Sequence, residues 1–588
     1  MKRRGKIILK DALKGYSHDL EKLISPKETV RRFYKRLKEV DMDILADTVR
    51  IDNGRLGIPV YFSICGRDAK RIIGTKKQMG KGGTPEQAEA SAIMELAERF
   101  SFFSFSKDPK NFLKVSFKDI KNQKALAFEY IVRSVHDKTD RLDRVEEVFS
   151  HIPLRWTWAY NMTKSEEVLI PFDWFYLINE FNGTSAGNCN EEAICQGICE
   201  VVERHVSSII SRKRLKRPHI RVQSIKDKVS LDLINRYKRV GVNLFISDFT
   251  LDMGIPSVGV LAYDPSTYPE KSEIVWTAGT TTNPYKSLNR ALTEVAQLAG
   301  DFNTSSNYVP SGLPKFKDLK EAHFVMEPSE WKDMDSLPDI SDKNIKIEVE
   351  SCIHALWNRG FEVIVLNITH PKLDIPAFYT IIPGAHFRER TLSDVAMTLG
   401  RVVCEIEDPE SALEMLKYMD RVLPNRYFLN FYMGLCHLKI SQWHRAEIAF
   451  RDALSLNPPD CDRVSIYSHL AYCLKEMSRF KEAIELCQKA LEYDSDRQDL
   501  FNIMGYCYYR LKEHQKAIDC FMEAVRIDPS SAIDYANIGV NYRLLGKRDK
   551  AIAFYLLALQ LDPDMEFVKE HLLSMGIDPE GEKSADAI

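Results

Sequence analysis

EAICQGICEVVER, residues 192–204, is the most informative stretch of this 588-residue sequence. Its polar residues at offsets 0, 4, 8 and 11 fall within about 80° of one another on an α-helix, so they form one stripe. The stripe consists of Glu192, Gln196, Glu200 and Glu203, and Arg204 follows it. The preceding loop, 182–188 (NGTSAGN), is rich in glycine and small polar residues, which suit anion binding by backbone N–H groups at a helix N-terminus.

A second helix with a similar acidic face is predicted after the glycine-rich loop 80–83. Thr84 suits the N-cap position, Pro85 the first helical position, and Gln87 would complete a capping box. The polar face of this helix carries Ser91, Glu95, Glu98 and Arg99.

A third helix is predicted after the threonine-rich loop 279–282, with Asn283 as its cap and Pro284 as its first residue. Its face carries Arg290, Glu294 and Gln297. Glutamates three residues apart on one helix repel each other, and a divalent cation would relieve that repulsion. Arginines among them suit phosphate oxygens. The pattern therefore predicts a nucleotide–magnesium site built from helices; the alternative is three ordinary solvated helix faces.

The three helices together resemble the YcaO family. The motif reads SxxxExxER, then EAxxQxxxExxER, then RxxxExxQ, and the resemblance covers about residues 15–400. It implies an α/β (α+β) fold and the use of ATP and Mg²⁺. It also implies that a nucleophile adds to a peptide-backbone amide and that ATP phosphorylates the resulting oxyanion. Loss of phosphate would then give an azoline, a thioamide or an amidine.

The resemblance also implies a role for each motif residue. The glutamates would hold Mg²⁺, as more than one ion: Glu95, Glu98, Glu200, Glu203 and Glu294. Arg204 and Arg290 would contact phosphates. The remaining polar positions would bind the nucleotide: Lys22, Thr29, Lys81, Ser91, Ser185, Asn188, Glu192, Gln196 and Gln297. Lys14 is an alternative to Lys22, and Arg99 is either a site residue or a structural ion-pair partner. No catalytic side chain or nucleophile is assigned, and His205 is expected to pack along its helix.

The last third of the sequence contains four similar units over about residues 427–564. Each has a small residue, an alanine 12 positions later, a residue that is usually aromatic 4 positions after that, and a further alanine. The units are Gly434/Ala446/Phe450/Ala453, Ala471/Ala483/Cys487/Ala490, Gly505/Ala517/Phe521/Ala524 and Gly539/Ala551/Tyr555/Ala558. They resemble the tetratricopeptide repeat (TPR), in which small residues let paired helices approach closely. A capping helix over 565–575 and a concave surface for a peptide or protein are expected; alternatively, the array only stabilises or dimerises the chain.

We therefore predict an α/β (α+β) domain over residues 1–405 and an all-α TPR domain over residues 406–588. Segments 244–263 and 364–383 are alike: each reads strand, polar turn with threonine, Ile-Pro, strand. This likeness predicts an internal pseudo-repeat of βββ or βαβ units, and for the domain as a whole we expect pseudo-repeated strand–loop–helix units. Segment 303–342 is polar and contains four prolines, so we expect an irregular excursion on the surface.

Composition narrows the class of protein. With 82 Lys+Arg and 84 Asp+Glu the net charge is −2, which argues against a nucleic-acid partner or an anionic membrane surface. The twelve cysteines include no CxxC pair, and the nearest grouping, Cys189, Cys195 and Cys199, is expected to be buried thiols of a reducing cytosol. No apolar run is long enough for a signal peptide or a membrane span. We expect a cytoplasmic protein.

The subtype of the family leaves the product open. Azoline-forming members often end in a PxPxP tail, which this sequence lacks. Thioamide-forming members are often paired with a TfuA protein, and one stand-alone member is linked to methylthiolation of a ribosomal protein. The first hypothesis is an amide-activating enzyme, with thioamidation as an example, whose TPR array recruits a substrate or partner. The second is a non-catalytic ATP-binding accessory or scaffold, such as a factor for a methylthiotransferase. A homodimer formed through the array is a third interpretation.

Overall fold

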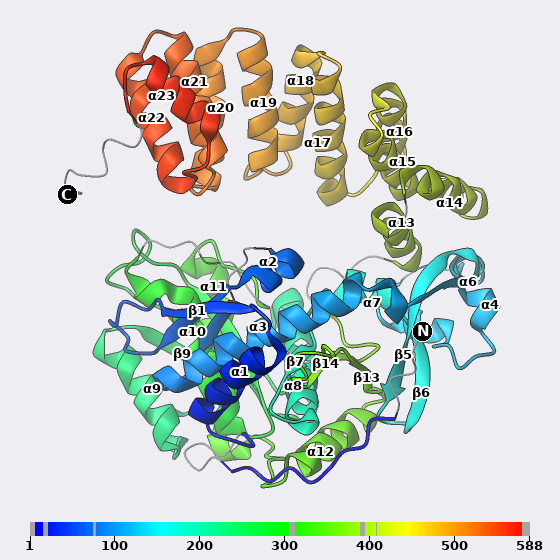
Figure 1. Cartoon of the computed structure of the whole chain (residues 1–588), viewed down its shortest axis with the longest axis vertical. Helices are drawn as coiled ribbons and strands as arrows, with labels where there is room; N and C mark the ends of the chain where they lie inside the picture. Colours follow the sequence, from blue (N-terminus) through cyan, green and yellow to red (C-terminus); the bar gives the residue numbers. More distant parts are fainter. Residues whose placement is uncertain are drawn as a thin grey trace. The chain divides into compact units, whose positions relative to one another are not determined.

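The computed structural model describes residues 6–15, 22–74, 78–137, 139, 141–304, 308, 312–387, 394–406 and 408–578. The chain forms two compact units, Met1–Thr398 and Leu399–Ile588. The first unit mixes strands and helices, whereas the regular elements described in the second are all helices (Figure 1). The predicted fold class is confirmed. Among the described helices, none has both the length and the apolar composition that a bilayer span requires.

The described residues of the first unit form three sheets. One is antiparallel: β1 (Leu45–Arg50), β2 (Val60–Cys65) and β3 (Gln78–Lys81). The second has the order β11 (Val275–Thr280), β10 (Ser257–Tyr263), β9 (Asn243–Asp248), β8 (His219–Ile220), β12 (Trp331–Lys332). The third has the order β4 (Leu113–Ser116), β5 (Pro153–Asn161), β13 (Ile364–Asn367), β14 (Ala377–Ile381), β7 (Thr184–Ala186), with β6 (Glu166–Pro171) paired to β5.

Twelve α-helices of the described residues accompany these sheets. They are α1 (Pro26–Val40), α2 (Arg67–Ile73), α3 (Pro85–Lys107), α4 (Phe117–Ile120), α5 (Phe128–Arg133), α6 (Leu142–His151), α7 (Phe172–Asn179), α8 (Asn190–Lys213), α9 (Lys228–Arg239), α10 (Pro284–Ala299), α11 (Leu319–Met326) and α12 (Ile345–Trp357).

The three motif helices begin where the sequence predicts. Thr84 caps α3, and Gln87 completes the capping box with it. The Asn283 side chain accepts hydrogen bonds from two backbone N–H groups in the first turn of α10. The cap of α8 is Cys189, whose Sγ accepts from Glu192 N at 3.4 Å. These caps satisfy N–H groups that would otherwise lack partners at a helix start.

The predicted likeness of segments 244–263 and 364–383 is confirmed, because each forms an antiparallel hairpin, β9–β10 and β13–β14. Both turns use a threonine in the same way. Thr250 Oγ1 accepts a hydrogen bond from Ser257 N at 3.2 Å, and Thr369 Oγ1 accepts one from Ala377 N at 3.0 Å. The likeness of the two segments therefore extends to the hydrogen bonds that set the register of each hairpin.

The prediction of an irregular surface excursion over 303–342 is wrong for part of its described residues. The segment contains α11 and the edge strand β12, which pairs in parallel with β8. Two of its aromatic residues are buried against the five-stranded sheet: the Phe316 ring stacks on Trp276 with centroids 5.0 Å apart, and Phe324 contacts the same tryptophan edge-on. The short elements and frequent prolines hid this packing from a periodicity argument.

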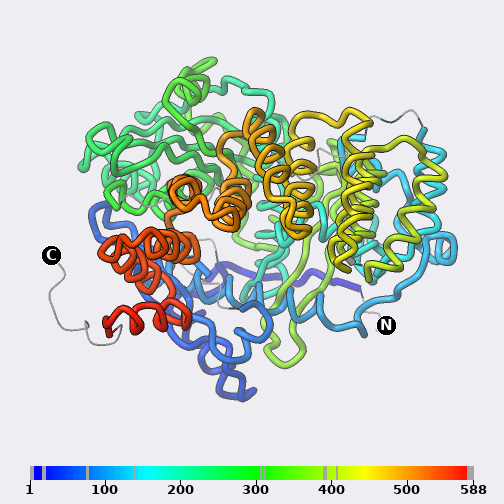
Figure 2. The backbone as a smooth tube through the Cα atoms, turned by 90° about the horizontal axis from the view of Figure 1, so that it is seen from above, coloured from blue at the N-terminus to red at the C-terminus, as the bar shows by residue number. Residues whose placement is uncertain are grey.

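The second unit is an array of helix pairs, whose members lie side by side in Figures 1 and 2. Its helices are α13 (Val395–Ile406), which begins in the first unit, α14 (Pro409–Val422), α15 (Tyr427–Lys439), α16 (Trp443–Ser455), α17 (Asp460–Glu476), α18 (Phe480–Leu491), α19 (Gln498–Arg510), α20 (His514–Ile527), α21 (Ala532–Leu544), α22 (Arg548–Leu561) and α23 (Glu566–Ser574). The last corresponds to the predicted capping helix.

Small residues in the array face large ones across each pair. A Cβ built on Gly505 would lie 2.7 Å from the Phe521 ring, too close for any real side chain. Gly434 with Phe450 and Gly539 with Tyr555 repeat this fit. The second repeat of the array has Ala471 in place of glycine, and Cys487 in place of the aromatic ring. The size of one partner thus compensates for the other, as close packing requires.

Candidate active site

Helices α3, α8 and α10 converge because of how they pack on the strands. Each helix contacts the strand that precedes it in sequence, so that three strand–helix pairs form: β3 with α3, β7 with α8, and β11 with α10. Each helix also contacts the strand of another pair: α3 contacts β7, α8 contacts β11, and α10 contacts β3. The three strand–helix pairs therefore close into a cycle, and the acidic faces of the three helices meet inside it.

The end of each strand supplies a hydrogen-bond donor to a glutamate on the neighbouring helix. The backbone N–H of Thr280 donates to Glu203 at 3.0 Å, and the Thr184 hydroxyl donates to Glu98 at 2.5 Å. Lys81 donates to Glu294 and forms an ion pair with it. A further N–H, that of Gly183, donates to Glu200 at 3.3 Å. The strand ends thus fix the directions of the carboxylates.

Two arginines lie among the glutamates. Arg99 pairs with Glu98 at 2.7 Å and with Glu95 at 3.3 Å, and its guanidinium lies 3.9 Å from the centre of the Phe181 ring. This geometry makes Arg99 an ion-pair partner within the cluster. Arg204 lies 3.6 Å from Glu200 and 3.5 Å from Glu203. Its buried Nε has no hydrogen-bond partner among the described residues, so the guanidinium retains donor capacity for an anion.

Burial and the close packing of the carboxylates raise the pKa values of three of them. Burial raises the pKa of Glu98 to about 8, and repulsion from Glu200 and Glu95 adds to the effect while Arg99 opposes it. Burial, with repulsion from Glu294, raises the pKa of Glu203 to about 7, although Arg204 opposes the shift. Burial also raises the pKa of Glu95. Part of the cluster therefore holds protons near neutral pH, and a cation that binds there has to displace them.

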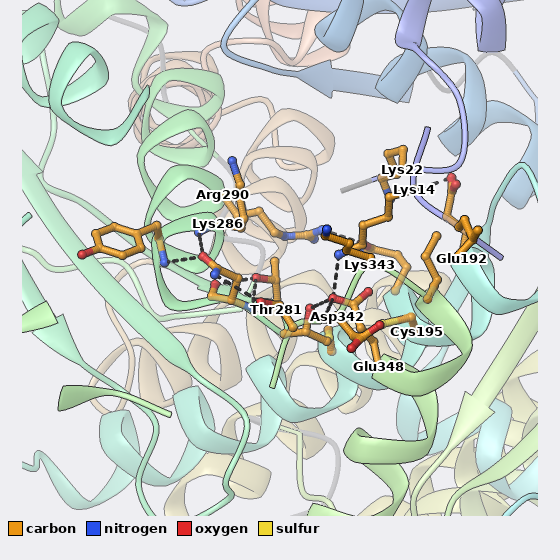
Figure 3. A pocket seen from close by; sticks show the side chains of 18 of the residues that line it. Lys14, Lys22, Glu192, Cys195, Thr281, Lys286, Arg290, Asp342, Lys343 and Glu348 are labelled. Carbon is orange, nitrogen blue, oxygen red and sulfur yellow. Dashed lines mark hydrogen bonds and ion pairs between the residues drawn. The ribbon is translucent and has the colours of Figure 1, made fainter. Parts of the chain in front are cut away.

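Beside the cluster is a cavity of about 890 Å³, a size suited to a nucleotide (Figure 3). Five of the predicted or alternative nucleotide residues line it: Lys14, Lys22, Glu192, Gln196 and Arg290. The picture shows Arg290 reaching from α10 toward the side where Lys14 and Lys22 lie. Cationic side chains along the wall suit the phosphates of such a ligand.

The polar residues of the wall are ordered by one another. Arg290 donates to Gln196 at 2.6 Å, which holds the guanidinium across the cavity. Glu192 accepts from Asn188 Nδ2 at 3.0 Å and lies 3.9 Å from the Lys22 ammonium. Thr29, on α1, donates to Asn188 at 3.2 Å. The N-terminal segment is thereby tied to the start of α8, as the predicted role of Lys22 and Thr29 requires.

Other predicted nucleotide residues do not line this cavity. Ser185 is buried and donates to the Ala193 carbonyl at 2.7 Å, so its hydroxyl holds the loop onto α8. Ser91 and Gln297 are half-buried on α3 and α10. Lys81 belongs to the glutamate cluster through its pairing with Glu294. The roles predicted for these four residues stay predictions.

Sequence reasoning missed one wall of the cavity. Lys286, Asp342, Lys343 and Glu348 line it. Glu348 accepts from Lys14 at 2.7 Å, and burial raises the pKa of its carboxyl. Asp342 and Lys343 lie in and beside the segment that was expected to be irregular, where no motif marks them. For Lys286 a signal existed, since it lies in the first turn of a helix already assigned to the site.

Comparison with known families gives three matches. The family model described as YcaO cyclodehydratase, ATP- and Mg²⁺-binding, matches residues 79–386, which is just over half of the chain. Two models of the tetratricopeptide repeat match residues 462–530 and 535–565.

Individual relatives agree with this. An uncharacterized protein of Methanothermobacter thermautotrophicus is 26% identical over 382 residues, which cover 61% of this chain and 94% of the relative. A protein described as uncharacterized in the tfuA 3′ region, from Rhizobium leguminosarum bv. trifolii, is 24% identical over 68% of this chain and 97% of its own length. The solved structure of a heterocyclase in complex with substrate and cofactor has a similar fold, with a TM-score of 0.55 and 21% identity. That match covers 67% of this chain and 57% of the heterocyclase.

Proposed function

The chain belongs to the YcaO family, and we propose that it uses ATP and Mg²⁺ to phosphorylate a peptide-backbone amide. The observation that carries the proposal is the glutamate cluster of α3, α8 and α10 next to a nucleotide-sized cavity. The family description, which names ATP and Mg²⁺ binding, supports it. The orphan Nε of Arg204 and the oxygen-rich donor set fit a metal-bound polyphosphate.

In this proposal the nucleoside occupies the cavity, and its phosphates extend toward Arg204 and Arg290. The glutamates that would hold Mg²⁺ are Glu95, Glu98, Glu200, Glu203 and Glu294. Bound Mg²⁺ supplies charge neutralisation for phosphoryl transfer. Among the described residues these carboxylate oxygens form no group of three within 4.8 Å of one another, so in this proposal binding of each Mg²⁺ uses one or two of them, with phosphate oxygens and water completing its shell. Release of the protons on Glu98 and Glu203 accompanies that step.

The chemical step balances without a redox reagent. A nucleophile adds to the amide carbonyl carbon, and the oxyanion attacks the γ-phosphorus of ATP as the bond to ADP breaks. The C–O bond then breaks, and the former amide oxygen leaves in inorganic phosphate. With hydrosulfide as the nucleophile, the sulfur forms a C=S bond as the C–O bond breaks and the S–H proton is lost, so the product is a thioamide. The relative described by its place beside tfuA supports thioamidation with a TfuA-like partner as the specific form of this reaction.

Nucleotide binding tests the proposal directly. We expect Mg²⁺-ATP to bind the full chain in isothermal titration calorimetry and Glu203→Gln to weaken that binding strongly. Glu86→Gln is the matched control, because Glu86 is an exposed glutamate in the first turn of α3, outside the cluster. Equal affinities of wild type and Glu203→Gln would contradict the proposal. Binding is a better readout than hydrolysis, since turnover requires the amide substrate.

The second candidate is a non-catalytic ATP-binding accessory protein, such as a factor for a methylthiotransferase, in which the repeat array carries the function by binding the partner. The array favours it, because TPR helices present extended surfaces to proteins. A pull-down with the candidate partner separates the two hypotheses. If modification of the partner survives Glu203→Gln but is lost when the chain ends at residue 405, the accessory role is correct. Circular dichroism of the shortened chain checks that it folds.

A further inference from the structure

Three cysteines meet beside the cavity. Cys195 and Cys199 are one turn apart on α8, and Cys352 lies on α12, which packs against α8. Their sulfur atoms all lie within 4.8 Å of one another. All three are free thiols; Cys199 and Cys352 are buried and Cys195 is half-buried. Among the described residues this is the only group of three or more His, Cys, Asp or Glu ligand atoms packed so closely.

We propose that Cys195, Cys199 and Cys352 form a binding site for a thiophilic d¹⁰ cation such as Zn²⁺. Three thiolates at the usual Zn–S distance of about 2.3 Å stand about 3.8 Å apart in a tetrahedral site. The observed spacing therefore needs a contraction of about 1 Å or less, which rotation of the side chains supplies. Thiolates are the ligands that select such soft ions.

Charged side chains surround the trio on its open side. The cavity that Cys195 and Cys199 line is also lined by five cationic side chains, Lys14, Lys22, Lys286, Arg290 and Lys343, and by four acidic ones, Glu192, Asp227, Asp342 and Glu348. Three thiolates around a divalent cation carry a net charge of −1, and the excess of positive side chains along this wall offsets it.

The site has three protein ligands and an open side. Structural zinc sites have four protein ligands, whereas catalytic zinc sites have three and keep the fourth position for water or substrate. Cys195 and Cys199 line the cavity, and Figure 3 shows Cys195 near Glu348 at its wall. The fourth position therefore faces the cavity, where a small anion or thiol can reach it. This inference does not depend on ATP binding, since it rests on different side chains.

Metal titration of the full chain tests the site. We expect the chelator-treated protein to bind one Zn²⁺ per chain, and Co²⁺ to give a thiolate charge-transfer band with strong tetrahedral d–d bands. Azide added to the Co²⁺ form should change the d–d bands, because the fourth ligand exchanges. Cys199→Ser and Cys352→Ser should each weaken Zn²⁺ binding by more than the roughly 10–100-fold expected for loss of an outer-shell partner. Cys189→Ser, at the cap of the same helix, should have no effect.

Alkylation mapping gives a readout that does not require the variants to fold. In wild-type protein, Zn²⁺ should protect Cys195, the half-buried member of the trio, from iodoacetamide, and should not protect the exposed Cys461. Absence of stoichiometric Zn²⁺ or Co²⁺ binding by wild type would overturn the proposal. So would a disulfide between two of the three, or binding that persists in both serine variants. A Co²⁺ spectrum unaffected by azide would overturn the open fourth position.

Discussion

Glu203→Gln should make the metal-free protein more stable at alkaline pH while it abolishes magnesium binding. Glu203 is 3% exposed, and its folded-state pKa of about 7 compares with 4.5 for an ordinary glutamate. An acid whose pKa is raised by folding binds more protons in the folded state than in the unfolded state. The free energy of unfolding therefore falls as pH rises from about 4.5 to about 7. A shift of 7 − 4.5 = 2.5 corresponds to about 3 kcal/mol.

Glutamine removes this cost and keeps an acceptor for the Thr280 N–H. The first unit has 398 residues, so its entropy of unfolding is about 0.8 kcal/mol/K, and 3 kcal/mol corresponds to about 4 °C in Tm. We expect Glu203→Gln to unfold about 4 °C above wild type at pH 8 in EDTA, and near the wild-type temperature at pH 5. Mg²⁺-ATP should raise the Tm of wild type only. Differential scanning calorimetry measures the Tm of both proteins at each pH and with Mg²⁺-ATP.

A different pattern would refute the reasoning. If Glu203→Gln lowers Tm by the same amount at pH 5 and pH 8, Glu203 is an ordinary ionised partner of Arg204 and not a carboxylate held at a cost. Glu86→Gln is the control, because an exposed glutamate should shift Tm little at either pH.

The remaining predictions concern the metal, the cavity and the array. Mg²⁺ affinity in calorimetry should rise up to about 50-fold from pH 6 to pH 7, because Glu98 and Glu203 both lose protons, and should level off near pH 9. A flat profile contradicts this. Arg290→Lys should weaken ATP binding about tenfold, since lysine cannot hold Gln196 and a phosphate together; an unchanged Kd contradicts it. Gly505→Ala should lower the Tm of the second unit by about 2–6 °C, because the added Cβ meets the Phe521 ring. If this loss of Tm comes from the clash, adding Phe521→Leu should restore part of it; no recovery contradicts the clash.

Local chemistry made parts of the site predictable. Thr84, Gln87 and Asn283 act over three or four residues, so the helix starts follow from sequence alone. Interactions between distant segments did not. Lys81 meets Glu294 across 213 residues, and no spacing rule connects them. Cys352 joins Cys199 only because α12 packs on α8, so the sequence pointed to Cys189 as the third member instead.

The cyclic packing explains why motif residues can be identified in the sequence while their partners cannot. Three of the four glutamates that the strand ends fix are held from a strand–helix pair other than their own: Thr280 of β11 holds Glu203 of α8, Thr184 of β7 holds Glu98 of α3, and Lys81 of β3 holds Glu294 of α10. The first of these donors is a backbone N–H, which any residue except proline would provide. Its position depends on the register of β11 against β10, where Thr280 pairs with Ser257. A slip by one residue would turn that N–H away, so the sheets set the geometry of the site and the helices supply its charge.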